Sequence, residues 1–265
     1  MAALNLMVGN IGTGKSLIAR KLMIDGAKVV NMDALQRMIA AGDYDRYDKA
    51  AKKVYHAAED AAILSCLELG LDVVVDRTNI DRKTRARFID MGKQYDAKII
   101  AWDFGKGDEH SLRRRLGHPH GVPQVTWEGV HEYMAGKYEA PDLAEGISEI
   151  VIHPKRFTAH AFDFDGVIVE NRFPEFGDII DQNVELLRRL WSDYSNLIIV
   201  WSCRSGDYSA QMRHFMIEHG IPFDFINENP TWEPGGRKLF AHHYYDDRNE
   251  IVPYRNPAFI EEANA

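Results

Sequence analysis

The sequence predicts an α/β fold with two tandem three-layer domains, one over residues 1–155 and the other over residues 156–265. Three observations support this prediction. Short apolar segments of strand length alternate with amphipathic segments of helix length, which is typical of parallel sheets covered by helices. A glycine-rich loop follows the first apolar segment, and a D-x-D-G sequence follows a similar segment near residue 160. The length of 265 residues is sufficient for two modest domains.

The glycine-rich loop spans Gly9 to Ser16 and fits the pattern G-x-x-x-x-G-K-[ST] at every fixed position. Residues 4–8 before it are expected to form a buried strand, and residues 17–22 after it begin a helix, which is the context this motif requires. Backbone N–H groups of such a loop, with the positive end of the helix, bind phosphates. The expected nucleotide-binding residues are Gly9, Gly12, Thr13, Gly14, Lys15 and Ser16. Lys15 would reach the β- and γ-phosphates and Ser16 would hold Mg²⁺, so ATP with Mg²⁺ is the expected ligand.

A carboxylate follows the next predicted strand, which covers residues 28–31 and ends at Asp33. Near a bound triphosphate, a carboxylate in this place suits a general base that takes the proton of an attacking hydroxyl. The alternative is a helix N-cap for the segment that begins at Ala34. The residues alone leave both interpretations open.

A second polar group follows the strand expected at residues 71–75, after a long helix expected at residues 48–70. Its members are Asp76, Arg77, Thr78 and Asn79, and they lie where open α/β sheets place their ligands. The basic run at residues 82–87 then begins another helix. Such a run is usually a solvated face, and beside a phosphate site it is also suited to a polyanion.

An arginine-rich segment follows the strand expected at residues 97–102 and precedes a helix expected at residues 126–138. Its arginines, Arg113, Arg114 and Arg115, are suited to close over a triphosphate and stabilise the charge of the transferred group. The pair His118 and His120 is not joined by other ligands at zinc spacing, so a zinc site is not expected.

Composition restricts the class of protein. Residues 1–155 carry equal numbers of acidic and basic side chains, and the remainder carries the whole net charge of -8. Two cysteines do not form a disulfide framework, so a reducing cytoplasm is expected. We expect no signal peptide, because the first apolar run is short, and without an apolar run long enough to span a membrane we expect no membrane partner.

With these motifs, residues 1–153 resemble the kinase domain of the bifunctional polynucleotide kinase–phosphatases of phages and bacteria. The resemblance rests on the phosphate loop, Asp33, the Asp76-x-Thr78-Asn79 sequence, the arginine segment before Val122-Pro123, and the closing segment 141–151. It implies that Asp33 activates a polynucleotide 5′-hydroxyl and that an arginine binds the acceptor phosphate. The family often has that arginine three residues after the aspartate, where this chain has Gln36, with Arg37 one place later. The second arginine of the lid is also missing, with His118 near its position.

The second half resembles the haloacid dehalogenase superfamily of phosphatases, because four of its motifs occur in order. These are Asp163-x-Asp165-Gly166, a strand that ends at Ser202, then Lys238, and finally Asp246-Asp247. The resemblance implies that Asp163 attacks phosphorus to form an aspartyl-phosphate, and that Asp165 acts as acid and base. Ser202 and Lys238 would hold phosphoryl oxygens. The oxygen ligands of Mg²⁺ would come from Asp163, Asp165 through its carbonyl, Asp246 and Asp247.

The spacing of these motifs leaves no room for a large cap domain, because the predicted helices 181–192 and 207–219 fill the gaps between them. We therefore expect an open phosphatase site, which suits a phosphate at the end of a polymer. The candidates to line it are Arg172, Arg204, Trp232 and Arg237. Packing in the loop of Pro230 and Pro234 is the alternative for Trp232.

The resemblance thus implies an end-healing enzyme that phosphorylates 5′-hydroxyl ends and removes 3′-phosphates from DNA or RNA. Its place would be the bacterial cytosol or, for a phage protein, the host cytoplasm. A homo-oligomer and a ligase acting on the same ends are compatible with this interpretation. One alternative is a kinase for another hydroxyl, such as a hydroxymethylated base in phage DNA or a small metabolite, with a phosphatase of separate substrate. Another is a nucleotide-gated protein that binds nucleic-acid ends with little catalysis.

Overall fold

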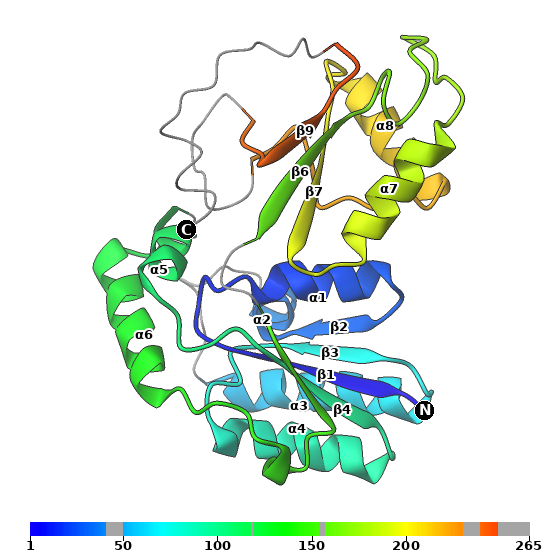
Figure 1. The fold of residues 1–265 in the computed structure, drawn as a ribbon. Helices are drawn as coiled ribbons and strands as arrows, with labels where there is room; N and C mark the ends of the chain where they lie inside the picture. The colour runs from blue at the N-terminus through cyan, green and yellow to red at the C-terminus, as the bar shows by residue number, and fades with distance from the viewer. Residues whose placement is uncertain (41–49, 118, 154–156, 230–238, 249–265) are drawn as a thin grey trace.

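We analysed a computed structural model of the chain, which describes residues 1–40, 50–117, 119–153, 157–229 and 239–248. It has a mixed α/β fold with two parallel sheets, one formed by residues before 153 and the other by residues after 157 (Figure 1). None of the helices in these ranges combines the length and the apolar character that a membrane crossing requires.

The first sheet has five parallel strands in the order β2-β3-β1-β4-β5. Their bounds are Ala3–Val8 for β1, Lys28–Asn31 for β2, Val73–Asp76 for β3, Lys98–Asp103 for β4 and Glu149–Ile152 for β5. The helices of this half are α1 (Lys15–Ile24), α2 (Met32–Ala40), α3 (Lys52–Glu68), α4 (Arg82–Gln94), α5 (Glu109–Gly117) and α6 (Gln124–Lys137), with a 3-10 turn η2 at Leu143–Glu145.

Helices cover both faces of this sheet, which explains its nearly continuous apolar strands. Leu4 and Leu6 of β1 pack in a core with Ile63 of α3 and Phe88 of α4. Met7, on the other face of β1, packs with α1. The expected elements are present with shifted ends. β3 begins at Val73, and Asp72, which was expected inside the strand, precedes it and accepts from the backbone N–H of Ala3 through its carboxylate.

The second sheet has four parallel strands in the order β8-β7-β6-β9. Their bounds are Thr158–Asp163 for β6, Asn196–Trp201 for β7, Phe225–Ile226 for β8 and His243–Tyr245 for β9. Helices α7 (Asp181–Trp191) and α8 (Asp207–Glu218) cover one face, where Phe162 and Val200 pack against Leu187 and Met216.

The other face of the second sheet packs against the first half of the chain. Leu197 and Ile199 of β7 share one apolar core with Ile18 of α1 and Trp102 of β4. Figure 1 shows α1 between the two sheets. The helix that begins at the phosphate loop therefore serves as a layer for both halves, whereas the sequence predicted a separate three-layer unit for each.

A buried lysine strengthens this contact. Lys21 of α1 has a side chain with no exposed surface, and its Nζ donates to the carbonyl of Asn196 at 2.7 Å. The same Nζ lies 3.6 Å from the Asp224 carboxylate and 4.1 Å from the centre of the Trp191 ring. All three partners belong to the second half, so α1 is anchored there by polar contacts as well as by apolar ones.

Candidate active site

The phosphate loop joins β1 to α1 as predicted, and glycines allow close packing around it. Gly12 and Gly14 have φ values of 69° and 100°, in the left-handed region. A Cβ at Gly12 would collide with the carbonyl of Ser111 in α5, and one at Gly14 would collide with the Phe157 ring. The loop is therefore enclosed by α5 on one side and by the start of the second half on another.

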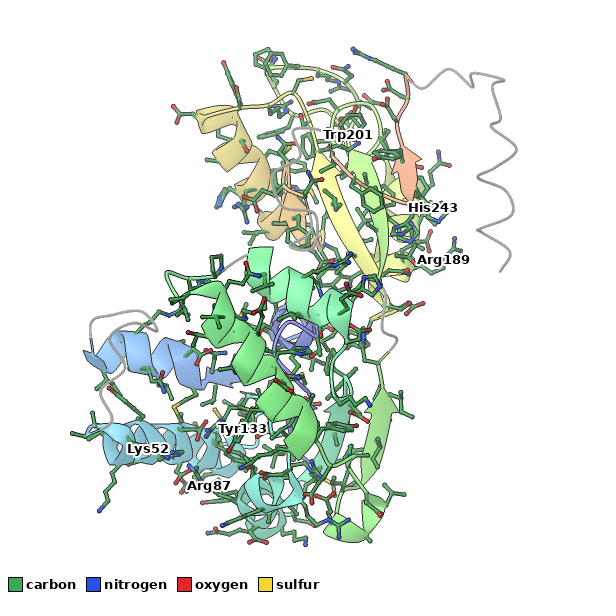
Figure 2. All side chains as sticks on the ribbon, turned by 90° about the vertical axis from the view of Figure 1, so that its left-hand side faces the viewer. Lys52, Arg87, Tyr133, Arg189, Trp201 and His243 are labelled. Atoms are coloured by element: carbon green, nitrogen blue, oxygen red, sulfur yellow. The ribbon has the colours of Figure 1, made fainter. Side chains whose placement is uncertain are left out.

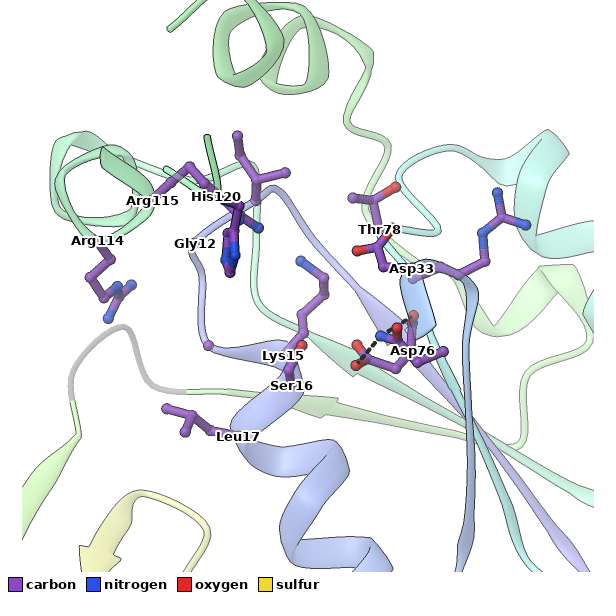
Figure 3. Close-up of a pocket in the computed structure, with 14 residues that line it drawn as sticks. Gly12, Lys15, Ser16, Leu17, Asp33, Asp76, Thr78, Arg114, Arg115 and His120 are labelled. Atoms are coloured by element: carbon purple, nitrogen blue, oxygen red, sulfur yellow. Dashed lines mark hydrogen bonds between the residues drawn. The ribbon is translucent and has the colours of Figure 1, made fainter. Parts of the chain in front are cut away.

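A cavity of about 420 Å³ opens at this loop, within the size range of small-molecule sites (Figure 3). It brings together most of the predicted kinase residues, which come from the phosphate loop, α1, α2, the segment after β3, and α5. Its lining consists of Ile11, Gly12, Gly14, Lys15, Ser16, Leu17, Asn31, Asp33, Asp76, Arg77, Thr78, Arg114, Arg115 and His120. Gly9 and Thr13, also predicted to bind nucleotide, do not line it. Thr13 instead donates through Oγ1 to the Asn10 carbonyl at 2.8 Å.

Charges of both signs converge on Lys15. Burial lowers the pKa of Lys15 to about 8; Asp76 and Asp33 oppose this effect, and Arg115 and Arg114 add to it. Its Nζ donates to the Asn10 carbonyl at 2.5 Å. A cation surrounded in this way gains strongly from an anionic ligand, which is the property a triphosphate site requires.

Asp33 lies in the first turn of α2 and faces the cavity. The residue that caps this helix is Asn31, whose Oδ1 accepts from the Ala34 N–H at 2.8 Å. The N-cap interpretation of Asp33 is therefore wrong, and its position on the cavity wall favours the alternative role of general base.

Asp76 belongs to the strand-end cluster that was expected near a ligand, although the sequence analysis gave it no chemical role of its own. It ends β3 and is 7% exposed, and its Oδ2 accepts from Asn31 Nδ2 at 2.8 Å. Burial raises the pKa of Asp76, while Lys15 and hydrogen bonds from Asn31 and Ser16 oppose the shift. What the structure adds is that this strand lies beside β1, so its carboxyl end brings the Asp76 carboxylate to the phosphate loop.

Of the three residues after Asp76, two line the cavity and the third is buried in the protein. Thr78 lines the cavity, and its carbonyl accepts from the Gly9 N–H at 2.8 Å. Arg77 also lines it while donating to buried Glu59 at 2.8 Å. Asn79, predicted to bind substrate, is fully buried and donates to the Met7 carbonyl at 2.9 Å. Asn79 therefore joins β1 to β3 rather than facing a ligand.

Of the three arginines of α5, two line the cavity and one does not. Arg114 and Arg115 line the cavity, on the side opposite Asp33 and Asp76 (Figure 3). The Arg115 guanidinium also lies 4.5 Å from the centre of the Trp127 ring in α6. Arg113, predicted to bind nucleotide, instead pairs with exposed Glu109 at 2.6 Å and does not line the cavity.

Several other basic residues that were expected near a ligand do not line the cavity. In the run 82–87, Arg85 is fully buried and pairs with Glu145 at 2.6 Å, and Arg87 pairs with Glu59 and Asp60. These two arginines are therefore structural, whereas Arg82 and Lys83 of the same run are exposed. Figure 2 shows Arg87 near the start of α3, where Lys52 lies. Arg37, predicted to bind substrate, is exposed and does not line the cavity.

A second cluster lies at the carboxyl ends of β6 and β9. Asp163, Asp246 and Asp247 offer carboxylate oxygens within 4.8 Å of one another, and no other such group occurs in the described ranges. Burial raises the pKa of Asp163 to about 6; the Phe164 backbone N–H opposes this shift, and the neighbouring carboxylates of Asp246, Asp247 and Asp165 add to it. The last strand thus brings together acids more than 80 residues apart in the sequence.

Next to this cluster, Asp165 is held by Arg204, with contacts of 2.8 Å to Nε and 2.7 Å to Nη2. Ser202 Oγ lies 3.3 Å from the same carboxylate. Arg204 was predicted to contact substrate, but it is 1% exposed and also donates to the carbonyls of Pro174 and Glu175. It therefore positions Asp165 and the loop that carries Pro174.

Three residues of the predicted second site, namely Trp232, Arg237 and Lys238, lie outside the described residues, as does His118 in the first half. Arg172 is exposed and pairs with Glu170 at 2.5 Å and Asp178 at 2.8 Å.

A family model described as an AAA domain matches residues 4–141, which is more than half of the chain. The chain belongs to this family. The match contains the phosphate loop, Asp33, Asp76 and the arginines of α5, so the AAA domain carries the whole cavity described above. These features make it a P-loop, kinase-like domain, and they indicate ATP binding.

Among solved structures, a conserved protein from Bacteroides thetaiotaomicron is 30% identical over 41% of this chain and 90% of that chain, with a TM-score of 0.32. A chain of the Pnkp1/Rnl/Hen1 RNA repair complex is 18% identical over 99% of this chain and 84% of that chain, with a TM-score of 0.42. Kti12 from Chaetomium thermophilum, in complex with ADP-AlF3, is 16% identical over 71% of this chain and 97% of that chain, with a TM-score of 0.41. No curated protein sequence matches the chain.

Proposed function

We propose that the protein is a nucleic-acid end-healing enzyme with two sites. The AAA domain transfers the γ-phosphoryl group of ATP to a 5′-hydroxyl end, and residues 156–265 form a phosphatase domain that removes a 3′-phosphate. The observation that carries the proposal is the cavity at the phosphate loop, where Lys15, Asp33 and Asp76 face Arg114 and Arg115.

In the transfer step, the acceptor hydroxyl oxygen bonds to the γ-phosphorus while the bond from that phosphorus to the β,γ-bridging oxygen breaks. ADP leaves, and Asp33 takes the hydroxyl proton. Lys15, Arg114 and Arg115 offset the negative charge of the phosphoryl group as it moves. A dissociative transfer of this kind needs mainly positioning and charge stabilisation, which the cavity provides from four separate elements.

The residues at the loop fit Mg²⁺. The Ser16 hydroxyl and the Asp76 carboxylate both line the cavity, and the hydroxyl acts to lower the pKa of Asp76. Burial makes the Asp76 charge costly, so a cation beside it would be stabilising. Magnesium held there would supply positive charge to offset that of the phosphates. Ser16 and Asp76 are the residues we assign to hold it.

In the second site, Asp163 would form a bond to the phosphorus of a 3′-phosphate as the ester oxygen leaves with a proton. Water then hydrolyses the aspartyl-phosphate and releases phosphate. We assign the proton transfers to Asp165, which Arg204 holds beside Asp163. Asp163, Asp246 and Asp247 fit Mg²⁺, because clustered carboxylate oxygens are its preferred ligands and a cation would relieve their mutual repulsion. Ser202, with Lys238, is assigned to the phosphoryl oxygens.

The proposal is tested with two oligonucleotides in Mg²⁺, one with a 5′-hydroxyl and γ-labelled ATP, the other with a 3′-phosphate. The wild-type protein should label the first and dephosphorylate the second. Lys15→Ala should abolish labelling and preserve dephosphorylation, because the two sites use separate residues, and Asp163→Asn should do the reverse. Loss of both activities in either variant would contradict two independent sites.

One observation favours a second candidate, a kinase for another hydroxyl such as a hydroxymethylated base or a small metabolite. Arg37, the basic residue nearest to the family's acceptor-phosphate position, does not line the cavity. If the 5′ end stays unlabelled while ATP is consumed on modified bases or small hydroxyl compounds, the second candidate is correct.

A further inference from the structure

Asn10, a variable position of the phosphate loop, has no exposed surface and connects the loop to the arginine-bearing helix region. Its Nδ2 donates to the Lys106 carbonyl at 2.8 Å and to the His131 carbonyl at 2.9 Å. Its Oδ1 accepts from the Ile11 N–H at 2.7 Å. One side chain thus joins the phosphate loop, the segment before α5, and α6.

The backbone of Asn10 takes part in the same connection. Its carbonyl accepts from Lys15 and Thr13, and its N–H donates to the Gly105 carbonyl at 3.2 Å. Asn10 therefore contacts Lys15 through its backbone carbonyl and α6 through its side-chain amide.

Close packing at two glycines reinforces this arrangement. A Cβ at Gly107 would collide with Asn10 and with the His131 ring, and a Cβ at Gly12 would collide with the Ser111 carbonyl. His131 Nε2 lies 2.9 Å from Ser111 Oγ, so α6 is joined to the first turn of α5. The loop, α5 and α6 form one tightly packed unit.

The far end of this unit supports an arginine of the cavity. Trp127 in α6 is 6% exposed, donates through Nε1 to the Pro119 carbonyl at 2.9 Å, and packs under the Arg115 guanidinium. A shift of α6 would move the Trp127 ring and change the position of Arg115. Asn10 holds α6 at the level of His131, one helical turn beyond Trp127.

We propose that Asn10 is a positioning residue that fixes α5 and α6 to the phosphate loop, so that Arg115 is already in place over the transferring phosphoryl group when ATP binds. This inference rests on the proposed kinase reaction. Arginines that stabilise phosphoryl transfer contribute large rate factors, and preorganisation keeps that contribution from being lost to reorientation. Asn10 would therefore affect turnover more than nucleotide affinity.

The test is a double-mutant cycle on turnover, with whichever acceptor the wild-type protein phosphorylates. Asn10→Ala should lower kcat by about tenfold or more while changing the Kd of ATP by less than about threefold. In an Arg115→Ala background the same substitution should lower kcat by less than about threefold, because the group that Asn10 positions is already absent. Equal losses in both backgrounds, or an unchanged kcat in Asn10→Ala, would overturn the proposal.

Asn10→Asp is the second variant, since it keeps the side-chain shape and the acceptor for Ile11 but loses both donated bonds. Amide hydrogen exchange of residues 109–117 should accelerate in this variant relative to wild type, and unchanged exchange would contradict the proposed attachment. Asn183→Ala, which removes a bond of 2.9 Å to the Val167 carbonyl in the second half, is the control and should leave both readouts unchanged. A wild-type protein that neither transfers phosphate nor hydrolyses ATP would refute the kinase proposal itself, whereas the exchange experiment tests Asn10 without catalysis.

Discussion

Asp76 illustrates how a single buried carboxylate can be maintained next to a nucleotide site. Its charge is supported by Asn31, Ser16 and Lys15, each from a different segment. The same surroundings suit a divalent cation. Burial removes the water that stabilises the charged carboxylate, and a cation bound to the carboxylate would stabilise that charge instead. The residue therefore links the ends of β2 and β3 to the phosphate loop.

Replacing this carboxylate by its amide is expected to impair phosphotransfer without unfolding the protein. Asp76→Asn keeps the shape but removes the charge we assign to Mg²⁺, so kcat at fixed Mg²⁺ should fall by about 100-fold or more. A titration of activity against Mg²⁺ should show half-saturation at a higher concentration.

Asp72→Asn is a matched control at the residue just before the same strand, where the carboxylate accepts from the Ala3 N–H. It should leave the Mg²⁺ titration unchanged. Identical titrations for Asp76→Asn and wild type would remove Asp76 from the magnesium site.

At the residue scale, the sequence predicted at which strand ends the site residues lie. It did not predict which charged side chains are buried. Arg85 and Arg204 occur in polar stretches that resemble solvated or ligand-binding segments. Their partners, Glu145 and Asp165, lie 60 and 39 residues away, so only the folded chain shows that these guanidinium groups are engaged. Asp33 and Lys15 could be placed because strand, loop and helix signals are local.

Helix α4 provides a test at the scale of an element. Its N-cap is Asp81, whose Oδ1 accepts from the Thr84 N–H at 2.7 Å. Asp81→Ala should lower the free energy of unfolding by about 1 kcal/mol, the usual value of such a cap. Urea denaturation at neutral pH measures this difference.

The contribution of this cap should depend on pH. Hydrogen bonds from the hydroxyl and the N–H of Thr84 lower the pKa of Asp81. Its stabilisation is therefore complete above the unfolded pKa of about 3.9 and is lost as pH falls through the lower folded value. Asp81→Asn keeps a capping acceptor without a titrating charge, so its stability should approach that of wild type at low pH. A constant difference between the two proteins down to pH 2 would contradict this assignment.

Elements with strong periodicity or buried apolar runs were predictable, including β1, β4, β7 and α7. The three-residue strand β9 was not, because so short a segment is ordered by its pairing with β6 rather than by a local pattern. β9 nevertheless carries Asp246 and Asp247 to Asp163. Part of the second cluster thus depends on a strand whose local sequence signal is weak.

For the whole molecule, the decisive feature is the apolar core that α1 shares with both sheets. Sequence patterns show that a strand is buried but not which element covers it. The two halves were therefore predicted to be separate three-layer domains, each with its own core. Because the core is shared, we expect the full chain to unfold in one cooperative transition.

Leu197→Ala tests this expectation from the second half. Leu197 is fully buried in the shared core, and its truncation should cost about 2–5 kcal/mol. Hydrogen exchange measured against urea concentration should show that β1 and β7 lose protection at the same, lowered midpoint. An unchanged midpoint for β1 with a lowered one for β7 would demonstrate two independent units.

The position of α1 also has a consequence for biosynthesis. When the ribosome has released only residues 1–155, the side of α1 that later meets β7 has no cover, and Lys21 has none of its later partners. Ile18 and Trp102 then lie at or near the surface of the nascent chain, where such apolar groups promote association with other molecules. During synthesis, the first half of the polypeptide therefore passes through a stage that is prone to aggregate, because part of its apolar surface is exposed. We expect chaperones to bind the nascent chain most strongly before β6 and β7 emerge.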